Sequence, residues 1–207
     1  MEKENILKAL AELRKEKKRK FSQTVELIIN LKNFDIKKQN VNIVVNVPNK
    51  VKDRNICAFL NKKSDFVDTI TKAEFDKYKD KREMKRLIKK YDFFIAVAGL
   101  MPAVATSFGK VLGPAGKMPS PQLGILPSED EKPIKDLLSI INKVIKIKSK
   151  EASLKVSIGK EELSDEQIAE NAITVYKAVF NALPRQKENL KSVLIKFTMS
   201  KPVKIPQ

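Results

Sequence analysis

The 207-residue sequence predicts a two-domain α/β protein in which a second domain is inserted into the first. Near both ends of the chain, apolar and polar residues alternate, which is typical of half-buried strands in an antiparallel sheet. In the middle, continuously apolar runs alternate with helical patterns, which indicates parallel βαβ packing. Neither end holds enough elements for a stable domain by itself. We therefore predict a discontinuous α/β sandwich domain, an antiparallel sheet with helices, from residues 1–50 and 148–207, and an inserted three-layer domain with a parallel sheet from residues 51–147.

The N-terminal end is predicted to contribute one helix and two strands. Residues 4–19 have isoleucine and leucine on one helical stripe and a basic run at the end, where cations complement the helix dipole. Residues 24–31 and 40–47 alternate apolar and polar side chains, so each predicts a half-buried strand. The connection 32–39 is short enough for these strands to form an antiparallel pair.

The middle of the chain is predicted to alternate buried strands with helices. The strands are expected over residues 54–60 and 92–100, which are apolar on both faces. Helices are expected over residues 72–91, 102–113 and 132–144, the last with proline near its start.

The C-terminal end returns to half-buried alternation. Residues 144–159 predict two antiparallel strands, and residues 191–199 predict a closing strand. Between them, residues 164–183 have a strong apolar stripe of helical period. Ser164 followed by Gln167 predicts a capping box at the start of this helix.

The charge balance indicates a partner that is a polyanion. The chain has 42 basic and 25 acidic residues, a net charge of +17. Only six of the basic residues are arginine, so most of the charge is on ammonium groups, which are suited to phosphate contact without base reading. The alternative is a lysine-rich solvated surface, as in hyperthermophile proteins. Nucleic acid is the first candidate partner.

The residues that are missing exclude several classes of protein. The chain has no histidine, which removes Ser-His-Asp and Cys-His catalysis and the usual zinc sites. The single cysteine, Cys57, cannot form an internal disulfide and lies in an apolar strand, so we expect a core residue in a reducing compartment. No run approaches the length of a membrane span, and the charged N-terminus is unlike a signal peptide. We therefore expect a cytoplasmic protein.

The stretch "GKVLGPAGKMPSPQLGILP", residues 109–127, holds four of the six glycines and four of the ten prolines. It does not match a P-loop, because Val111 stands five residues before Gly116 and Lys117 is followed by methionine and proline. The G-x-G-x-x-G fingerprint is absent as well. Proline restricts φ and glycine permits positive φ, so the stretch predicts a long rigid loop.

Four segments together resemble the ribosomal protein L-one family, the large-subunit stalk protein, in its archaeal form. They are "SFGKVLGPAGKMPSPQLGILP" (107–127), "KFSQTVELIINL" (20–31), "VSIGK" (156–160) and "FTMSKPVKI" (197–205). The resemblance implies a discontinuous first domain, no enzymatic activity and no cofactor. It implies binding to large-subunit ribosomal RNA at a mobile stalk, as a monomer within the ribosome, and help in the release of deacylated tRNA. It also implies repression of the protein's own mRNA.

The resemblance implies an RNA-binding surface on the first domain. Its expected members are Lys20, Phe21, Thr24, Glu26, Ser157, Gly159, Lys160, Thr198, Met199 and Ser200. Lysines would meet phosphates, Phe21 and Met199 would pack on riboses or bases, and the hydroxyls would bond 2′-hydroxyls. Glu26 would accept a hydrogen bond from a 2′-hydroxyl or an exocyclic amine. Considered alone, Phe21 and Met199 are expected to pack in the core, and only the resemblance indicates an RNA contact for them. Ser200 stands where the family often has glycine.

The glycine- and proline-rich stretch is expected to add auxiliary residues on the inserted domain. The resemblance implies that Gly113, Pro114, Gly116 and Pro119 set the shape of the loop, and that Lys110 and Lys117 make auxiliary phosphate contacts.

Two rival functions remain. One is a nucleotide-dependent transferase on the inserted domain, although the sequence of that domain has no phosphate-binding fingerprint. The other is binding to an anionic membrane surface, although the N-terminal helix has no aromatic residue on its apolar stripe, as such binding would need.

Overall fold

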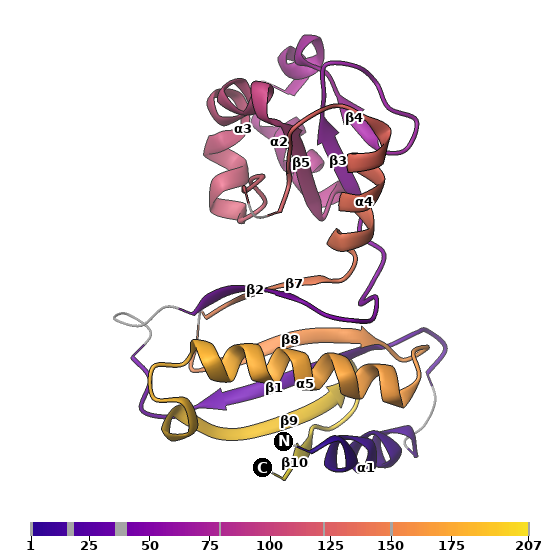
Figure 1. The fold of residues 1–207 in the computed structure, drawn as a ribbon, viewed down its shortest axis with the longest axis vertical. Helices are drawn as coiled ribbons and strands as arrows, with labels where there is room; N and C mark the ends of the chain where they lie inside the picture. The colour runs from indigo at the N-terminus through magenta and orange to yellow at the C-terminus, as the bar shows by residue number, and fades with distance from the viewer. Residues whose placement is uncertain are drawn as a thin grey trace. The chain divides into compact units, whose positions relative to one another are not determined.

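The structure is a computed structural model and describes residues 2–15, 19–35, 41–78, 80–121, 123–149 and 151–206. The chain forms two compact units, unit 1 from residues 1–52 and 143–207 and unit 2 from residues 53–142. Each unit has its own core, and among the described residues unit 1 contains two sheets while unit 2 contains one (Figure 1). The mixed α/β fold class is the predicted one.

Unit 1 is built on a four-stranded antiparallel sheet with the order β10-β9-β1-β8. Its strands are β1 (Thr24–Leu31), β8 (Ser153–Lys160), β9 (Leu190–Phe197) and β10 (Val203–Ile205). A second, two-stranded antiparallel sheet pairs β2 (Asn42–Asn46) with β7 (Val144–Lys148). Chain segments that are far apart in sequence therefore lie side by side in both sheets (Figure 1).

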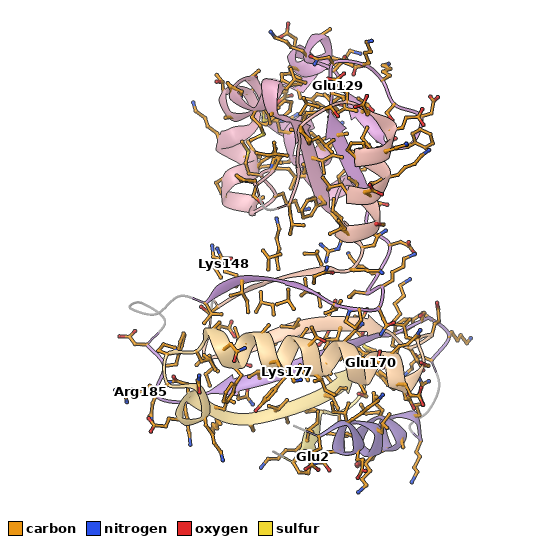
Figure 2. All side chains as sticks on the ribbon, in the orientation of Figure 1. Glu2, Glu129, Lys148, Glu170, Lys177 and Arg185 are labelled. Atoms are coloured by element: carbon orange, nitrogen blue, oxygen red, sulfur yellow. The ribbon has the colours of Figure 1, made fainter. Side chains whose placement is uncertain are left out.

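Two helices cover one face of the four-stranded sheet. They are α1 (Lys3–Arg14) and α5 (Asp165–Ala182), and their buried residues share one core with alternate residues of the strands. β1 shows the strict alternation that makes this possible, since every second residue from Val25 to Leu31 is buried. The predicted capping box starts α5: the Ser164 hydroxyl accepts from the Gln167 amide, and the Gln167 side chain accepts from the Ser164 amide. Glu170 and Lys177 lie on the exposed side of this helix (Figure 2).

Strand pairing in unit 1 corrects two predictions. β1 and β2 do not pair, because both edges of β1 are occupied by β8 and β9. The two strands predicted over residues 144–159 exist, but β7 pairs with β2 and β8 pairs with β1. The helix predicted over residues 4–19 ends at Arg14. Residues 16–18 of that helix and residues 36–40 of the predicted connection lie outside the described residues.

Unit 2 is a parallel sheet between helices. Its strands have the order β4-β3-β5-β6. They are β3 (Ile56–Phe59), β4 (Asp68–Ile70), β5 (Phe93–Val97) and β6 (Ile125–Leu126). The helical elements are η1 (Lys72–Tyr78), α2 (Lys81–Lys90), η2 (Ala98–Leu100), α3 (Met101–Ala115) and α4 (Glu131–Ile141). The short 3-10 helix η3 (Gln186–Asn189) belongs to unit 1.

Both faces of the parallel sheet are buried, which explains the continuous apolar runs. On one face, Phe59 and Phe94 pack with Phe108 of α3, and the Phe59 ring lies 5.8 Å from Phe94 and 5.0 Å from Phe108 between centroids. The alternate residues of β3 and β5 point to the other face, where α4 buries Ile134 and Ile141 (Figure 1). This arrangement gives the three layers that the βαβ pattern predicted.

Unit 2 also corrects the sequence predictions. The helix predicted over residues 72–91 is two elements, because Asp80 caps α2 by accepting from the Arg82 amide at 3.0 Å. Strands β4 and β6 were not predicted, since two or three residues are too short to show a period. The predicted inserted segment 51–147 is too long at its end, because β7 pairs with β2 of unit 1. No helix among the described residues is long and apolar enough to cross a membrane.

Candidate nucleic-acid interface

Three separate segments meet at one end of the four-stranded sheet of unit 1. They are the approach to β1 (residues 19–24), the turn after β8 (161–163) and the turn after β9 (198–200). The Thr198 amide donates to the Thr24 carbonyl at 3.1 Å, and the Glu161 amide donates to the Gln23 carbonyl at 2.8 Å. We call these three segments the convergence site. Most of the residues that the sequence nominated for RNA contact lie in it or beside it.

Thr24 and Thr198 form the connection between β1 and the turn after β9. The Thr198 hydroxyl accepts from the Thr24 amide at 3.1 Å and lies 3.3 Å from the Thr24 carbonyl, to which it can donate. A hydroxyl has one proton and two lone pairs, so this arrangement leaves one acceptor position for a partner. Thr198 is exposed and lies just beyond the end of β9. The prediction of a strand through residue 199 is therefore two residues too long.

Ser200 closes the turn after β9. Its hydroxyl accepts from the Phe197 amide at 2.8 Å, and its own amide donates to the Phe197 carbonyl at 3.1 Å. Among the described residues other than glycine, positive φ occurs at Asn33 and Gln186, so Ser200 adopts an ordinary backbone conformation. The serine side chain shapes the turn, and the backbone conformation there does not require a glycine.

Phe21 and Met199 are large apolar side chains left in solvent. Phe21 is 53% exposed and Met199 is 59% exposed. The core-packing alternative for both residues is therefore wrong. About half of each side chain is still exposed, so burying the remainder in a complex would contribute about 0.8–1.5 kcal/mol. Two such side chains at one site indicate a surface that a partner covers.

Gln23 supports the convergence site and was missed by sequence reasoning. Only 5% of it is exposed, and its side-chain oxygen accepts from the Met199 amide at 3.1 Å. Its backbone amide donates to the Glu161 carboxylate at 3.3 Å. The alternation of buried and exposed residues in β1 could have indicated this role, since position 23 falls on the buried side of the strand that starts at Thr24. A polar residue at such a position must find a polar partner.

A shallow hollow of about 410 Å³ lies beside Phe21. Its lining residues are Arg14, Arg19, Lys20, Phe21, Ser22, Glu161 and Glu162. Arg14 is committed to the fold, because its guanidinium donates to Asp165 at 2.7 Å and to the Leu163 carbonyl at 3.1 Å. Arg19 and Lys20 are exposed, which makes them the cations of this hollow that can meet a phosphate.

Glu26 and Ser157 lie side by side on the sheet face that points away from the core. They are register partners between β1 and β8, and Lys196 of β9 stands opposite Glu26 on the other side. All three are half-buried. Lys196 was not nominated from the sequence, although the period-two pattern of β9 places it on this face.

Gly159 does not belong to the exposed surface. It is buried in β8 opposite Val25, next to an irregularity in the β1–β8 register. A Cβ there would lie 2.7 Å from the Leu163 Cδ1 atom. The glycine therefore permits close packing of the turn after β8, which is a structural role. Lys160 ends the strand opposite Thr24 and is half-buried.

The glycine- and proline-rich stretch on unit 2 is partly helical. Gly113 and Pro114 belong to α3. Gly116 caps the C-terminal end of this helix, and its φ of 67° lies in the left-handed region that favours glycine. Pro119 is buried and Lys110 is exposed. The expectation of one long loop over residues 109–127 is therefore wrong in its first part.

Lys117 has a structural role in place of the expected phosphate contact. Its ammonium group donates to the backbone carbonyls of Ile88 and Tyr91, both at 2.7 Å. These carbonyls lie at the C-terminal end of α2, where a cation complements the helix dipole. Lys117 therefore fixes the stretch to α2, and its ammonium group is already bound to two carbonyls.

The rival transferase site is poorly supported by unit 2. The strand order places a topological switch between β3 and β5, where α/β enzymes bind nucleotides. After β3, the amide and side chain of Asn61 both donate to the Glu129 carboxylate, at 2.8 and 2.5 Å. Neither phosphate fingerprint occurs here. Within the described ranges no cluster of three or more metal-ligating side chains is found.

The fold and the convergence site define a basic, two-unit α/β protein whose first unit presents exposed apolar, hydroxyl and cationic groups at one sheet end. The sequence pattern of the ribosomal protein L1p/L10e family matches residues 13–201, and the chain belongs to this family. Its relatives include the large ribosomal subunit protein uL1 of Archaeoglobus fulgidus, 38% identical over 99% of both chains. The uL1 proteins of Nanoarchaeum equitans and Pyrobaculum aerophilum are 36% and 35% identical. These alignments cover 93% and 98% of this chain and 95% and 94% of the relatives. The relatives have the names of ribosomal proteins and not of enzymes.

Proposed function

We propose that this chain is a protein of the large ribosomal subunit that binds ribosomal RNA through the convergence site of unit 1. The observation that carries the proposal is the joint exposure of Phe21 and Met199 beside the cations Arg19 and Lys20. The family membership and the full-length similarity to large-subunit proteins support it.

Each class of group at the site suits a different part of RNA. The ammonium and guanidinium groups of Lys20 and Arg19 meet phosphates, and the flat Phe21 ring and the flexible Met199 side chain pack on riboses or bases. Thr198 retains an acceptor position for a 2′-hydroxyl. The sheet face around Glu26 and Ser157 supplies a carboxylate and a hydroxyl to the same partner.

The same surface provides a mechanism for autogenous repression. If one site binds both ribosomal RNA and an element in the protein's own mRNA, then excess protein binds the message only when ribosomal RNA is saturated. The two RNAs should compete, and Met199→Ala should weaken both in parallel. We also propose a role in the departure of deacylated tRNA, measured as its release rate from ribosomes with and without this chain.

The test of the site is a binding titration with matched substitutions. Phe21→Ala and Met199→Ala should each lower the affinity for the ribosomal RNA fragment by about 1–3 kcal/mol, a five- to 150-fold loss. The controls are Phe66→Ala and Val44→Ala, which remove apolar side chains of comparable exposure, 46% and 40%, outside the convergence site. Equal effects in the site and control variants would show that the convergence site is not the RNA-binding surface.

A further inference from the structure

Helix α2 of unit 2 concentrates positive charge. Its ten residues, Lys81–Lys90, include six basic residues and one acidic residue, a net charge of +5. The remaining residues of the segment 53–142 include ten basic and eleven acidic residues, a net charge of −1. The positive charge of this unit is therefore placed on one helix, which a general need for solubility does not explain.

The outward side of α2 is a continuous cationic stripe. Met84, Leu87 and Ile88 pack against the core of unit 2. On the outward side the spacing i, i+3, i+4 and i+7 aligns four exposed cations. They are Arg82, Lys85, Arg86 and Lys89, and we call them the α2 stripe. Seven residues at 1.5 Å rise give the stripe a length of about 10 Å.

This arrangement is unfavourable for the helix in the free protein. Like charges three and four residues apart repel each other. Arg82 also stands in the first helical turn, where the positive end of the helix dipole disfavours a cation. Glu83 offsets part of this repulsion, because its carboxylate pairs with Arg86 at 2.6 Å. A polyanion that covered the stripe would remove the repulsion.

The chemistry of the stripe fits a nucleic acid backbone better than a protein or a membrane. The exposed large apolar side chains of the described residues lie elsewhere, at Phe21, Val44, Phe66, Ile140 and Met199. Protein interfaces have an apolar core and are depleted in lysine. Helices on membrane surfaces insert apolar side chains. Each strand of a B-form duplex has one charge per about 3.4 Å of axis, so a stripe of about 10 Å can face about three phosphates of one strand.

We propose that the α2 stripe is a second RNA-binding surface, which contacts the backbone of duplex RNA without reading its sequence. It lies on unit 2 and is independent of the convergence site, so it goes beyond the function proposed above. Two chain connections join the units, at residues 52–53 and 142–143. Because the connections keep the stripe at high effective concentration near bound RNA, it would prolong the complex that unit 1 forms.

The test uses full-length protein and a 20-base-pair RNA duplex of arbitrary sequence. The test variant is Lys85→Glu/Lys89→Glu, and the control is Lys72→Glu/Lys132→Glu, which makes the same charge change at exposed positions of unit 2 outside α2. At 50 mM salt the test variant should lose at least about tenfold in affinity, and its slope of log affinity against log salt should flatten by about two. The control should lose less than about threefold. An equal loss in both variants, or no loss in the test variant, would overturn the proposal.

A second measurement avoids substitution altogether. In the unmodified protein, the RNA duplex should protect Lys85 and Lys89 from acetylation and leave Lys72 and Lys132 reactive. Equal protection of all four lysines would contradict the stripe. Failure of this proposal is distinguishable from failure of the proposed function. Met199→Ala should lower the affinity for the ribosomal RNA fragment and leave the affinity for the arbitrary duplex unchanged.

Discussion

Asn171 of α5 is the polar group on which unit 1 should depend most. It is fully buried on the apolar side of the helix. Its side-chain oxygen accepts from the Asn49 amide at 3.0 Å, and its side-chain nitrogen donates to the carbonyls of Asn49 and Ile158 at 3.2 and 2.9 Å. One side chain therefore connects α5, the segment that leads out of unit 1, and β8.

The expected loss follows from these three hydrogen bonds. Each contributes about 1 kcal/mol net, so Asn171→Leu, which keeps the volume, should lower the free energy of unfolding by about 2–4 kcal/mol. Unit 1 has about 117 residues, for which 1 kcal/mol corresponds to about 4 °C, so its melting temperature should fall by about 8–16 °C. Asn171→Ala should lose more, because it adds a cavity.

Calorimetry on the full chain measures this effect. The control is Lys177→Ala on the exposed side of the same helix, which should change stability by less than about 0.5 kcal/mol. A loss below about 1 kcal/mol for Asn171→Leu would refute the reasoning, since it would mean that water replaces all three bonds.

Binding to ribosomal RNA should weaken by about a hundredfold or more between 50 and 200 mM salt, as expected for several phosphate contacts, and a flat response would contradict this. Gln23→Leu should remove the acceptor for the Met199 amide and lower RNA affinity several-fold by loosening the turn, while far-ultraviolet circular dichroism stays unchanged; unaltered affinity would show that the turn holds its shape without Gln23. Burial raises the pKa of the Cys57 thiol to about 12, so at pH 8 roughly one molecule in ten thousand is thiolate and a thiol reagent should modify only the unfolded chain; rapid labelling of the folded protein would contradict this. Replacing residues 53–142 with a short Gly/Ser linker should leave unit 1 folded and able to bind ribosomal RNA, because the Arg54 amide donates to the Asn142 side-chain oxygen at 3.2 Å and the two ends of the excised segment therefore lie close together; an unfolded product would show that unit 1 needs the insertion.

Local pattern determined the longer helices and strands of this protein and their buried sides. Alternation in β1, the continuous apolar run of β5 and the Ser164–Gln167 capping box each depend on neighbours within a few residues, so they were predictable. The composition similarly indicated a polyanion partner, because net charge needs no coordinates. The four segments that resemble the family indicated the candidate RNA-binding residues.

The tertiary structure alone decided which strands pair and what each candidate side chain does. β1 takes β8 and β9 as partners because core packing brings together segments more than a hundred residues apart, which no local period encodes. For the same reason Lys117 binds two carbonyls of α2 while Met199 stays in solvent. Lysine and methionine are both long, flexible side chains, and the sequence does not show what they contact. Only the neighbours that the fold supplies determine whether such a side chain is bound within the protein or remains free for a partner.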